Sequence, residues 1–144
     1  MASANLILSK RTGRETQVRE IIQPEGLWDP RPRFAQVLKS GKQAWIAGQV
    51  SVDENGNTVG EGDIEAQTLR VFENLSKALE SIGAGFDDVV KLTVYSTDLD
   101  AHLPTIAAFR AKHFSEPVPS TTVQVSRLVK PEWLVEVEAE VALP

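Results

Sequence analysis

The chain has 144 residues, a length that fits one domain with a sizeable core. Its net charge of −5 argues against a nucleic-acid binder, because such proteins normally carry a basic surface. The absence of cysteine excludes disulfides, thiolate nucleophiles and cysteine-based zinc sites. No apolar run approaches the ~20 residues of a membrane-spanning helix, and the N-terminal apolar span is too short for a signal peptide. We therefore expect a cytoplasmic protein with a single domain over residues 1–144, and no nucleic-acid or membrane partner.

Three strands are predicted in the first third of the chain. Residues 17–22 are the first candidate strand, and the segment 23–33, with three prolines and a glycine, must be a loop. Residues 34–50 contain two β-type runs separated by a Ser-Gly-Lys turn at 40–42, which predicts a hairpin.

Helices and strands alternate in the next part. Asp63 opens a helix whose apolar residues recur at helical spacing until a glycine-rich segment at 83–85 ends it. Residues 89–97 are rich in β-branched and aromatic side chains, which indicates a buried strand. We expect Asp100 to cap a second helix that ends near His113.

Two last strands, at residues 121–127 and 134–142, complete an α+β chain in the order β-β-β-α-β-α-β-β. Each helix has one apolar stripe, so both helices must cover the same face of a single mixed sheet. A chain of this length has no third layer for the other face. A homo-oligomer is the simplest arrangement that buries it.

The segment 118–128 has an unusual division between its two faces. Alternation places Ser120, Thr122, Gln124 and Ser126 on one face as a row of short, uncharged polar groups. A solvated strand face usually carries charges. The function of this uncharged row stays open from the residues alone.

The last strand carries three glutamates, Glu136, Glu138 and Glu140, which share one face and repel one another modestly. One interpretation is a solvated strand face, and the other is that a glutamate lines a cleft as a general base or orients a water molecule. Both stay open from the residues alone.

Other chemistry-bearing residues give weaker signals. His102 and His113 are too far apart for a two-histidine metal face, so we expect structural or solvent-facing roles. The nucleotide-binding and hydrolase motifs are missing, and we predict no cofactor and no metal. The tryptophans are candidates for an aromatic pocket, although core or interface packing is the commoner role; they are Trp28, Trp45 and Trp133.

Three segments, residues 44–57, 63–99 and 125–141, together resemble the RidA (YjgF) family, and the likeness extends from about Phe34 to the C-terminus. The most specific matches are short motifs: Gly48-Gln49, Ala66-Gln67-Thr68, Asp88-Val89-Val90-Lys91 and Arg127-Leu128. The resemblance implies a chorismate-mutase-like α+β homotrimer with small-molecule pockets in the clefts between subunits.

The resemblance also implies hydrolysis of reactive enamines and imines to a ketoacid and ammonia. That activity relies on an arginine that pairs with the substrate carboxylate, and its position is Ser120 here. The glutamate that holds water corresponds to Glu136, our predicted catalytic residue. Three further polar positions of the family are apolar in this chain, and the predicted substrate-binding set is Phe34, Ala47, Gly48, Ile106, Ser120 and Thr122.

These departures predict a ligand that is less anionic and more apolar than aminoacrylate. Arg31 or Arg33, in the proline-rich loop, could replace the missing cation. The first hypothesis is a hydrolase or deaminase of a small imine, enamine or related C–N compound. The alternative is a non-catalytic trimer that binds small molecules or acts as a chaperone-like or regulatory protein. RNA cleavage, attached to some members of the family, is disfavoured by the acidic balance.

Overall fold

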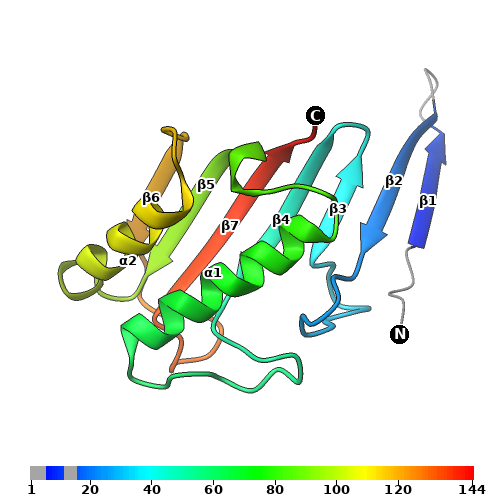
Figure 1. The fold of residues 1–144 in the computed structure, drawn as a ribbon. Helices are drawn as coiled ribbons and strands as arrows, with labels where there is room; N and C mark the ends of the chain where they lie inside the picture. The colour runs from blue at the N-terminus through cyan, green and yellow to red at the C-terminus, as the bar shows by residue number, and fades with distance from the viewer. Residues whose placement is uncertain (1–5, 12–15) are drawn as a thin grey trace.

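The computed structural model describes residues 6–11 and 16–144 (Figure 1). This part of the chain forms seven strands and two α-helices, with a single short 3-10 turn before the fifth strand. In chain order the elements are β1 (Leu6–Arg11), β2 (Thr16–Ile22), β3 (Val37–Ser40), β4 (Gln43–Gln49), α1 (Ile64–Glu80), η1 (Phe86–Asp88), β5 (Val89–Ser96), α2 (Leu99–His113), β6 (Ser120–Gln124) and β7 (Val135–Ala142).

All seven strands form one mixed sheet in the order β1-β2-β3-β4-β7-β5-β6. Only the β5–β6 pair is parallel, and the five other neighbouring pairs are antiparallel. Both helices lie on the same face of the sheet (Figure 1), α1 across its middle and α2 beside β5 and β6. The predicted α+β class and the placement of both helices on one face are therefore confirmed.

Helix α1 supplies most of the core between the helices and the sheet. Its start is fixed by Asp63, whose side chain accepts a hydrogen bond from the backbone N–H of Ala66 at 3.0 Å. Val71, Leu75 and Leu79 recur on one face of the helix and are fully buried, together with Val137 of β7. Burying each such side chain stabilises the fold by about 1.5–3 kcal/mol.

The structure differs from the sequence prediction in several places. Strand β1 was not predicted; it pairs with β2 in a register that sets Leu6 opposite Ile21. Helix α2 is capped by Asp98, not Asp100, because the Asp98 side chain accepts from the Ala101 N–H at 3.1 Å. Strand β6 ends at Gln124 rather than at residue 127. Strand pairing depends on a partner strand, which a local residue pattern does not report.

Helix α2 is held by polar contacts as much as by apolar packing. Ile106 is its one buried residue. The predicted polar row of β6 lies under this helix: Gln124 Oε1 accepts from the Leu99 N–H at 2.9 Å, and Ser120 and Thr122 accept from Arg110. One role of the uncharged row is thus to fix α2 on the edge of the sheet.

Both histidines have structural contacts, as expected. The His102 ring nitrogen Nδ1 lies 3.1 Å from the buried Ser96 hydroxyl. His113 stacks on Phe72 with ring centroids 4.7 Å apart, and its Nδ1 lies 2.7 Å from the Phe109 carbonyl. No α-helix in the described residues is long and apolar enough to cross a membrane.

Candidate functional site

Glu136 is the central residue of the candidate site. It lies on β7 between Val135 and Val137, both of which are fully buried against the helices. Because side chains alternate along a strand, Glu136 points to the face of the sheet that no helix covers. Its ladder partner on that face is Tyr95 of β5. The site therefore begins on the open face of the sheet.

Gly48 on β4 leaves the space in which the Glu136 carboxyl group lies. A Cβ atom built on Gly48 would overlap Glu136 Oε1 and lie 2.7 Å from its Cδ. The β4–β7 ladder also shifts register between Ile46 and Gln49, so Gly48 lies at an irregularity between two regularly paired stretches. A glycine at this bend permits the close approach of the carboxyl group to the backbone.

An aromatic cavity of about 200 Å³ opens on one side of Glu136. Trp28 and Phe34 meet edge to face within its wall, with ring centroids 6.1 Å apart. Trp133 is held by a hydrogen bond from its indole N–H to the Thr58 hydroxyl at 3.1 Å. The other lining residues are Arg33, Gln36, Gly48, Gln49, Val50, Val52 and Val129. The cavity is sized for a small molecule with an apolar portion.

A more open pocket of about 480 Å³ lies on the other side of Glu136, where Arg127 and Glu138 join the lining. The Tyr95 hydroxyl donates to Glu138 Oε1 at 2.6 Å, and this bond, with burial, raises the pKa of Tyr95 to about 12. Tyr95 therefore stays a neutral hydrogen-bond donor at physiological pH. Val129 is 80% exposed and lies at the rim of both spaces.

The environment of Glu136 suits proton transfer. Partial burial raises the pKa of its carboxyl group above the ordinary range of glutamate, and the negative charge of Glu138 raises it further. A carboxylate with a raised pKa is a better base, because its affinity for a proton lies nearer to neutral pH. Glu136 can thus accept a proton from a water molecule and return it.

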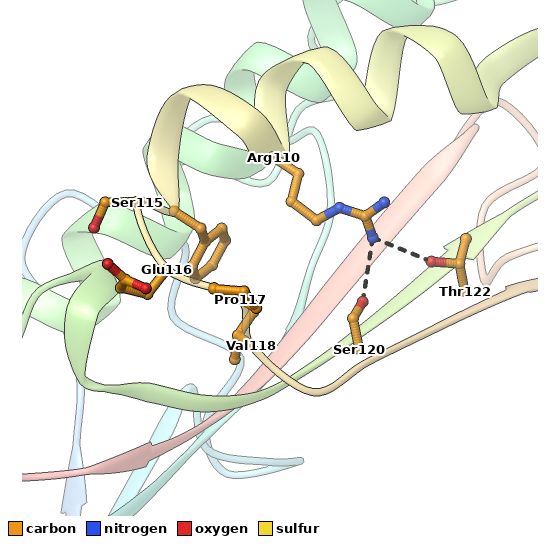
Figure 2. A pocket seen from close by; sticks show the side chains of 8 residues that line it. Arg110, Ser115, Glu116, Pro117, Val118, Ser120 and Thr122 are labelled. Carbon is orange, nitrogen blue, oxygen red and sulfur yellow. Dashed lines mark hydrogen bonds between the residues drawn. The ribbon is translucent and has the colours of Figure 1, made fainter.

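Ser120 and Thr122 lie on the opposite face of the sheet from Glu136. Their ladder partners are Leu92 and Val94, which are buried under the helices. A separate cavity of about 650 Å³ opens here between α2 and β6. In Figure 2, Arg110 extends from α2 toward both hydroxyls, with its Nη1 atom 3.2 Å from Ser120 Oγ and 3.5 Å from Thr122 Oγ1.

Five of the seven predicted site residues fall into two groups within one chain. Phe34, Gly48 and Glu136 share the aromatic cavity, whereas Ser120 and Thr122 line the cavity beside α2.

Two of the predicted residues belong to neither group. Ala47 is half-buried on β4 next to Gly48, and its carbonyl accepts from the Gln49 side chain at 2.9 Å. Ile106 is wholly buried in the core and lines neither the aromatic cavity nor the cavity beside α2, so its role in ligand binding stays a prediction.

The two loop arginines have different surroundings. Arg31 forms an ion pair with Asp29 at 2.6 Å, which lowers the pKa of the Asp29 carboxyl group. Arg33 lies over the Trp28 ring, 5.5 Å from its centroid, and lines the aromatic cavity. Of the two, only Arg33 lines the cavity beside Glu136.

Arg110 is the residue that sequence reasoning missed. It lies on the α2 face that meets β6, and no local motif distinguishes it from a solvent-facing arginine.

The tryptophans in the sequence correctly indicated an aromatic pocket in two of three cases. Trp28 and Trp133 line the aromatic cavity, whereas Trp45 lies on the open face of β4 away from it. Among the residues described, no three His, Asp or Glu side chains are grouped closely enough to hold a metal ion.

One mixed β-sheet, covered on one face by two helices, carries a partly buried glutamate beside a cavity of small-molecule size. Residues 27–143 match the family described as Endoribonuclease L-PSP. The chain belongs to this family, whose members are also called RidA, YjgF or RutC proteins. The resemblance in the sequence is confirmed.

Relatives and solved structures agree with this assignment. A RutC family protein of Pyrococcus abyssi is 38% identical over 122 residues, covering 84% of this chain and 94% of the relative. A protein of Acinetobacter baylyi named 3-aminoacrylate deaminase RutC is 32% identical, covering 83% of this chain and 94% of the relative. The structure of RidA from an Antarctic Psychrobacter is 32% identical, covers 84% of this chain and 97% of that one, and superposes with a TM-score of 0.75.

Proposed function

We propose that this protein is a hydrolase that deaminates a small imine, enamine or related C–N compound. The observation that carries the proposal is the Glu136 carboxyl group, which has a raised pKa and lies in the space left by Gly48 beside an aromatic cavity. A 32% identical relative bears the name of a deaminase, which supports the same class of reaction.

The chemistry requires one group that takes up and returns a proton. Glu136 removes a proton from water as the oxygen attacks the C=N carbon, and it passes this proton to the nitrogen, which gives a carbinolamine. Glu136 then takes the hydroxyl proton of the carbinolamine and passes it to the amino group as the C–N bond breaks. The products are a carbonyl compound and ammonia, and Glu136 is again a carboxylate. An enamine enters the same sequence after a proton adds to its carbon. The aromatic wall, with Trp28 and Phe34, packs against the apolar part of the substrate.

We also propose that the working site lies between subunits of a homotrimer. Glu136 and Ser120 are on opposite faces of one sheet, so one chain cannot bring both to the same ligand. The open face carries exposed apolar groups, including Trp45 at 39% and Val123 at 37% exposure. Contact between copies would bury these side chains and could bring the β6 edge of one subunit to the Glu136 cavity of the next.

Substrate specificity should differ from that of a protein with an arginine at position 120. Ser120 offers a neutral hydroxyl, while the Glu136 cavity is lined by three aromatic side chains: Trp28, Phe34 and Trp133. We therefore expect a preference for substrates with a larger apolar portion.

The direct test is release of ammonia and ketoacid from freshly generated imines with side chains of increasing size. Wild-type protein should exceed the uncatalysed rate, and Glu136→Gln should fall to that rate. Glu140→Gln is the matched control, because Glu140 lies on the same face of β7 outside the candidate site. Equal rates for wild type and Glu136→Gln on every imine would overturn the proposal.

A second candidate is a non-catalytic small-molecule binder. The uncharged residue at position 120 favours it, because the strongest expected substrate contact is then missing from β6. Saturable binding of a ketoacid by a protein that leaves imine hydrolysis at the uncatalysed rate would establish this alternative. A separate cleavage assay with a labelled single-stranded RNA tests the endoribonuclease activity that the family's name states.

A further inference from the structure

We infer that Arg110, with the hydroxyls of Ser120 and Thr122, binds the carboxylate of the substrate. The identity of the ligand as a carboxylate-bearing imine rests on the proposed function. The presence of an anion site rests on the charge and hydrogen-bond geometry of the cavity between α2 and β6.

The charge of Arg110 is not neutralised by a carboxylate. Within residues 6–11 and 16–144, ion pairs join Arg31 to Asp29 and Arg70 to Glu73, and Arg110 takes part in neither. Glu116 lines the same cavity but lies too far from Arg110 to form an ion pair. A half-buried guanidinium with only neutral partners leaves a positive potential in the cavity.

The hydrogen bonds of Arg110 leave donors free for a ligand. Its Nη1 group contacts both hydroxyls, at 3.2 and 3.5 Å, and within the described chain its Nε and Nη2 groups have no hydrogen bond. Each hydroxyl that accepts from Arg110 keeps its own proton to donate. A guanidinium edge and two O–H donors therefore converge on one cavity, an arrangement that suits a carboxylate.

The position of Arg110 revises the expectation of a less anionic ligand. The polar row on β6 has a cation, but it comes from α2 rather than from β6 itself (Figure 2). Because α2 and β6 are held together by the Gln124–Leu99 hydrogen bond, the guanidinium is carried on a fixed part of the fold. A carboxylate bound by Arg110 would lie on the α2 side of Ser120. The distance from this carboxylate to Glu136 of a neighbouring subunit would then differ from that set by an arginine at position 120, and so would the length of the preferred substrate.

Calorimetric titration of the full-length protein with pyruvate tests the inference without turnover. Wild-type protein should bind pyruvate more tightly than pyruvamide, its neutral analogue, and Arg110→Gln should weaken pyruvate binding about 10- to 100-fold. Arg110→Lys keeps the charge but lacks the planar fork, so it should weaken binding several-fold. Arg19→Gln, an exposed arginine on β2, is the matched control and should bind as wild type does.

Two further variants sharpen the test. Arg33→Gln removes the guanidinium in the aromatic cavity and should weaken pyruvate binding less than Arg110→Gln does. Ser120→Arg combined with Arg110→Gln returns a guanidinium to the cavity from β6 and should restore part of the affinity. Loss of binding in Arg33→Gln with retention in Arg110→Gln would overturn the inference, as would equal affinity for pyruvate and pyruvamide. Binding that depends on Arg110, in a protein that hydrolyses no imine, would support the anion site while refuting the proposed reaction.

Discussion

The carboxyl group of Glu136 occupies the space that a side chain at position 48 would fill. Gly48 has an ordinary backbone conformation, so it is required for this approach and not for a left-handed turn. The glycine and the glutamate come from adjacent antiparallel strands, β4 and β7, and their relation depends on the register shift between those strands.

Replacing Gly48 with Ala should abolish activity with little loss of stability. The new methyl group would meet the end of a flexible side chain, so the Glu136 carboxyl group would move aside at low cost. We expect the free energy of unfolding to change by less than about 1 kcal/mol, while imine hydrolysis falls to the level of Glu136→Gln. Denaturant unfolding and the ammonia-release assay measure the two effects. A fully active Gly48→Ala protein would show that the position of this carboxyl group is unimportant.

Replacing Glu136 with Gln should stabilise the protein at neutral pH. The pKa of Glu136 is raised in the folded state, so protonated Glu136 favours folding and its contribution is lost as pH rises through the folded-state pKa. The amide has no charge to bury, and the gain at pH 7 should be below about 1 kcal/mol, because the group is partly exposed and solvent screens it. Below the unfolded-state pKa of about 4.3 the difference should vanish. Thermal unfolding at pH 4 and pH 7 decides this, and a variant less stable than wild type at pH 7 would contradict it.

Replacing Glu138 with Gln should move the acid limb of the activity profile to lower pH. The charge of Glu138 helps raise the pKa of Glu136, and its removal lets Glu136 lose its proton at lower pH. The amide oxygen can still accept the hydrogen bond from Tyr95, so the local geometry is kept. The measurement is kcat/KM against pH, with Glu140→Gln as the control. An unchanged acid limb would mean that another group sets it.

Replacing Gln67 with Leu should destabilise the protein by roughly 2–4 kcal/mol, because buried polar groups lose their partners. The side chain is fully buried; its Nε2 donates to the carbonyls of Gly60 and Glu132, and its Oε1 accepts from the Leu134 N–H. These bonds tie α1 to the segment that carries Trp133. The exposed neighbour Leu69 offers a control, since Leu69→Gln should change the free energy of unfolding by much less. Urea titration compares the two, and equal stabilities would refute the assignment.

Mixing two inactive variants should restore activity if the site lies between subunits. Chains with Glu136→Gln still supply Arg110, and chains with Arg110→Gln still supply Glu136. After joint unfolding and refolding of equal amounts, about a quarter of the interfaces in a cyclic trimer would combine an intact Glu136 from one subunit with an intact Arg110 from its neighbour. Light scattering should report a trimer mass across a dilution series. A monomer, or a mixture no more active than its parents, would place the site within one chain.

Local patterns in the sequence were sufficient to predict the main helix and the buried face of the last strand. Helix α1 was predicted because its apolar residues repeat at helical spacing between an aspartate cap and a glycine-rich end. The alternation of valine and glutamate in β7 correctly separated a buried face from a glutamate-bearing one. Both signals depend on neighbours within a few positions along the chain, which is why the residues alone carry them.

Tertiary structure decided what those signals could not. Strand β1 is recognisable only through its pairing with β2, and the closeness of Glu136 to Gly48 depends on the register of two strands far apart in the chain. Arg110 looks like any charged residue on a helix until α2 is docked against β6 and its guanidinium meets two hydroxyls. Periodicity determines which side of an element is buried. The partner it meets there is set by non-local packing and strand order, because a local pattern contains no information about distant segments.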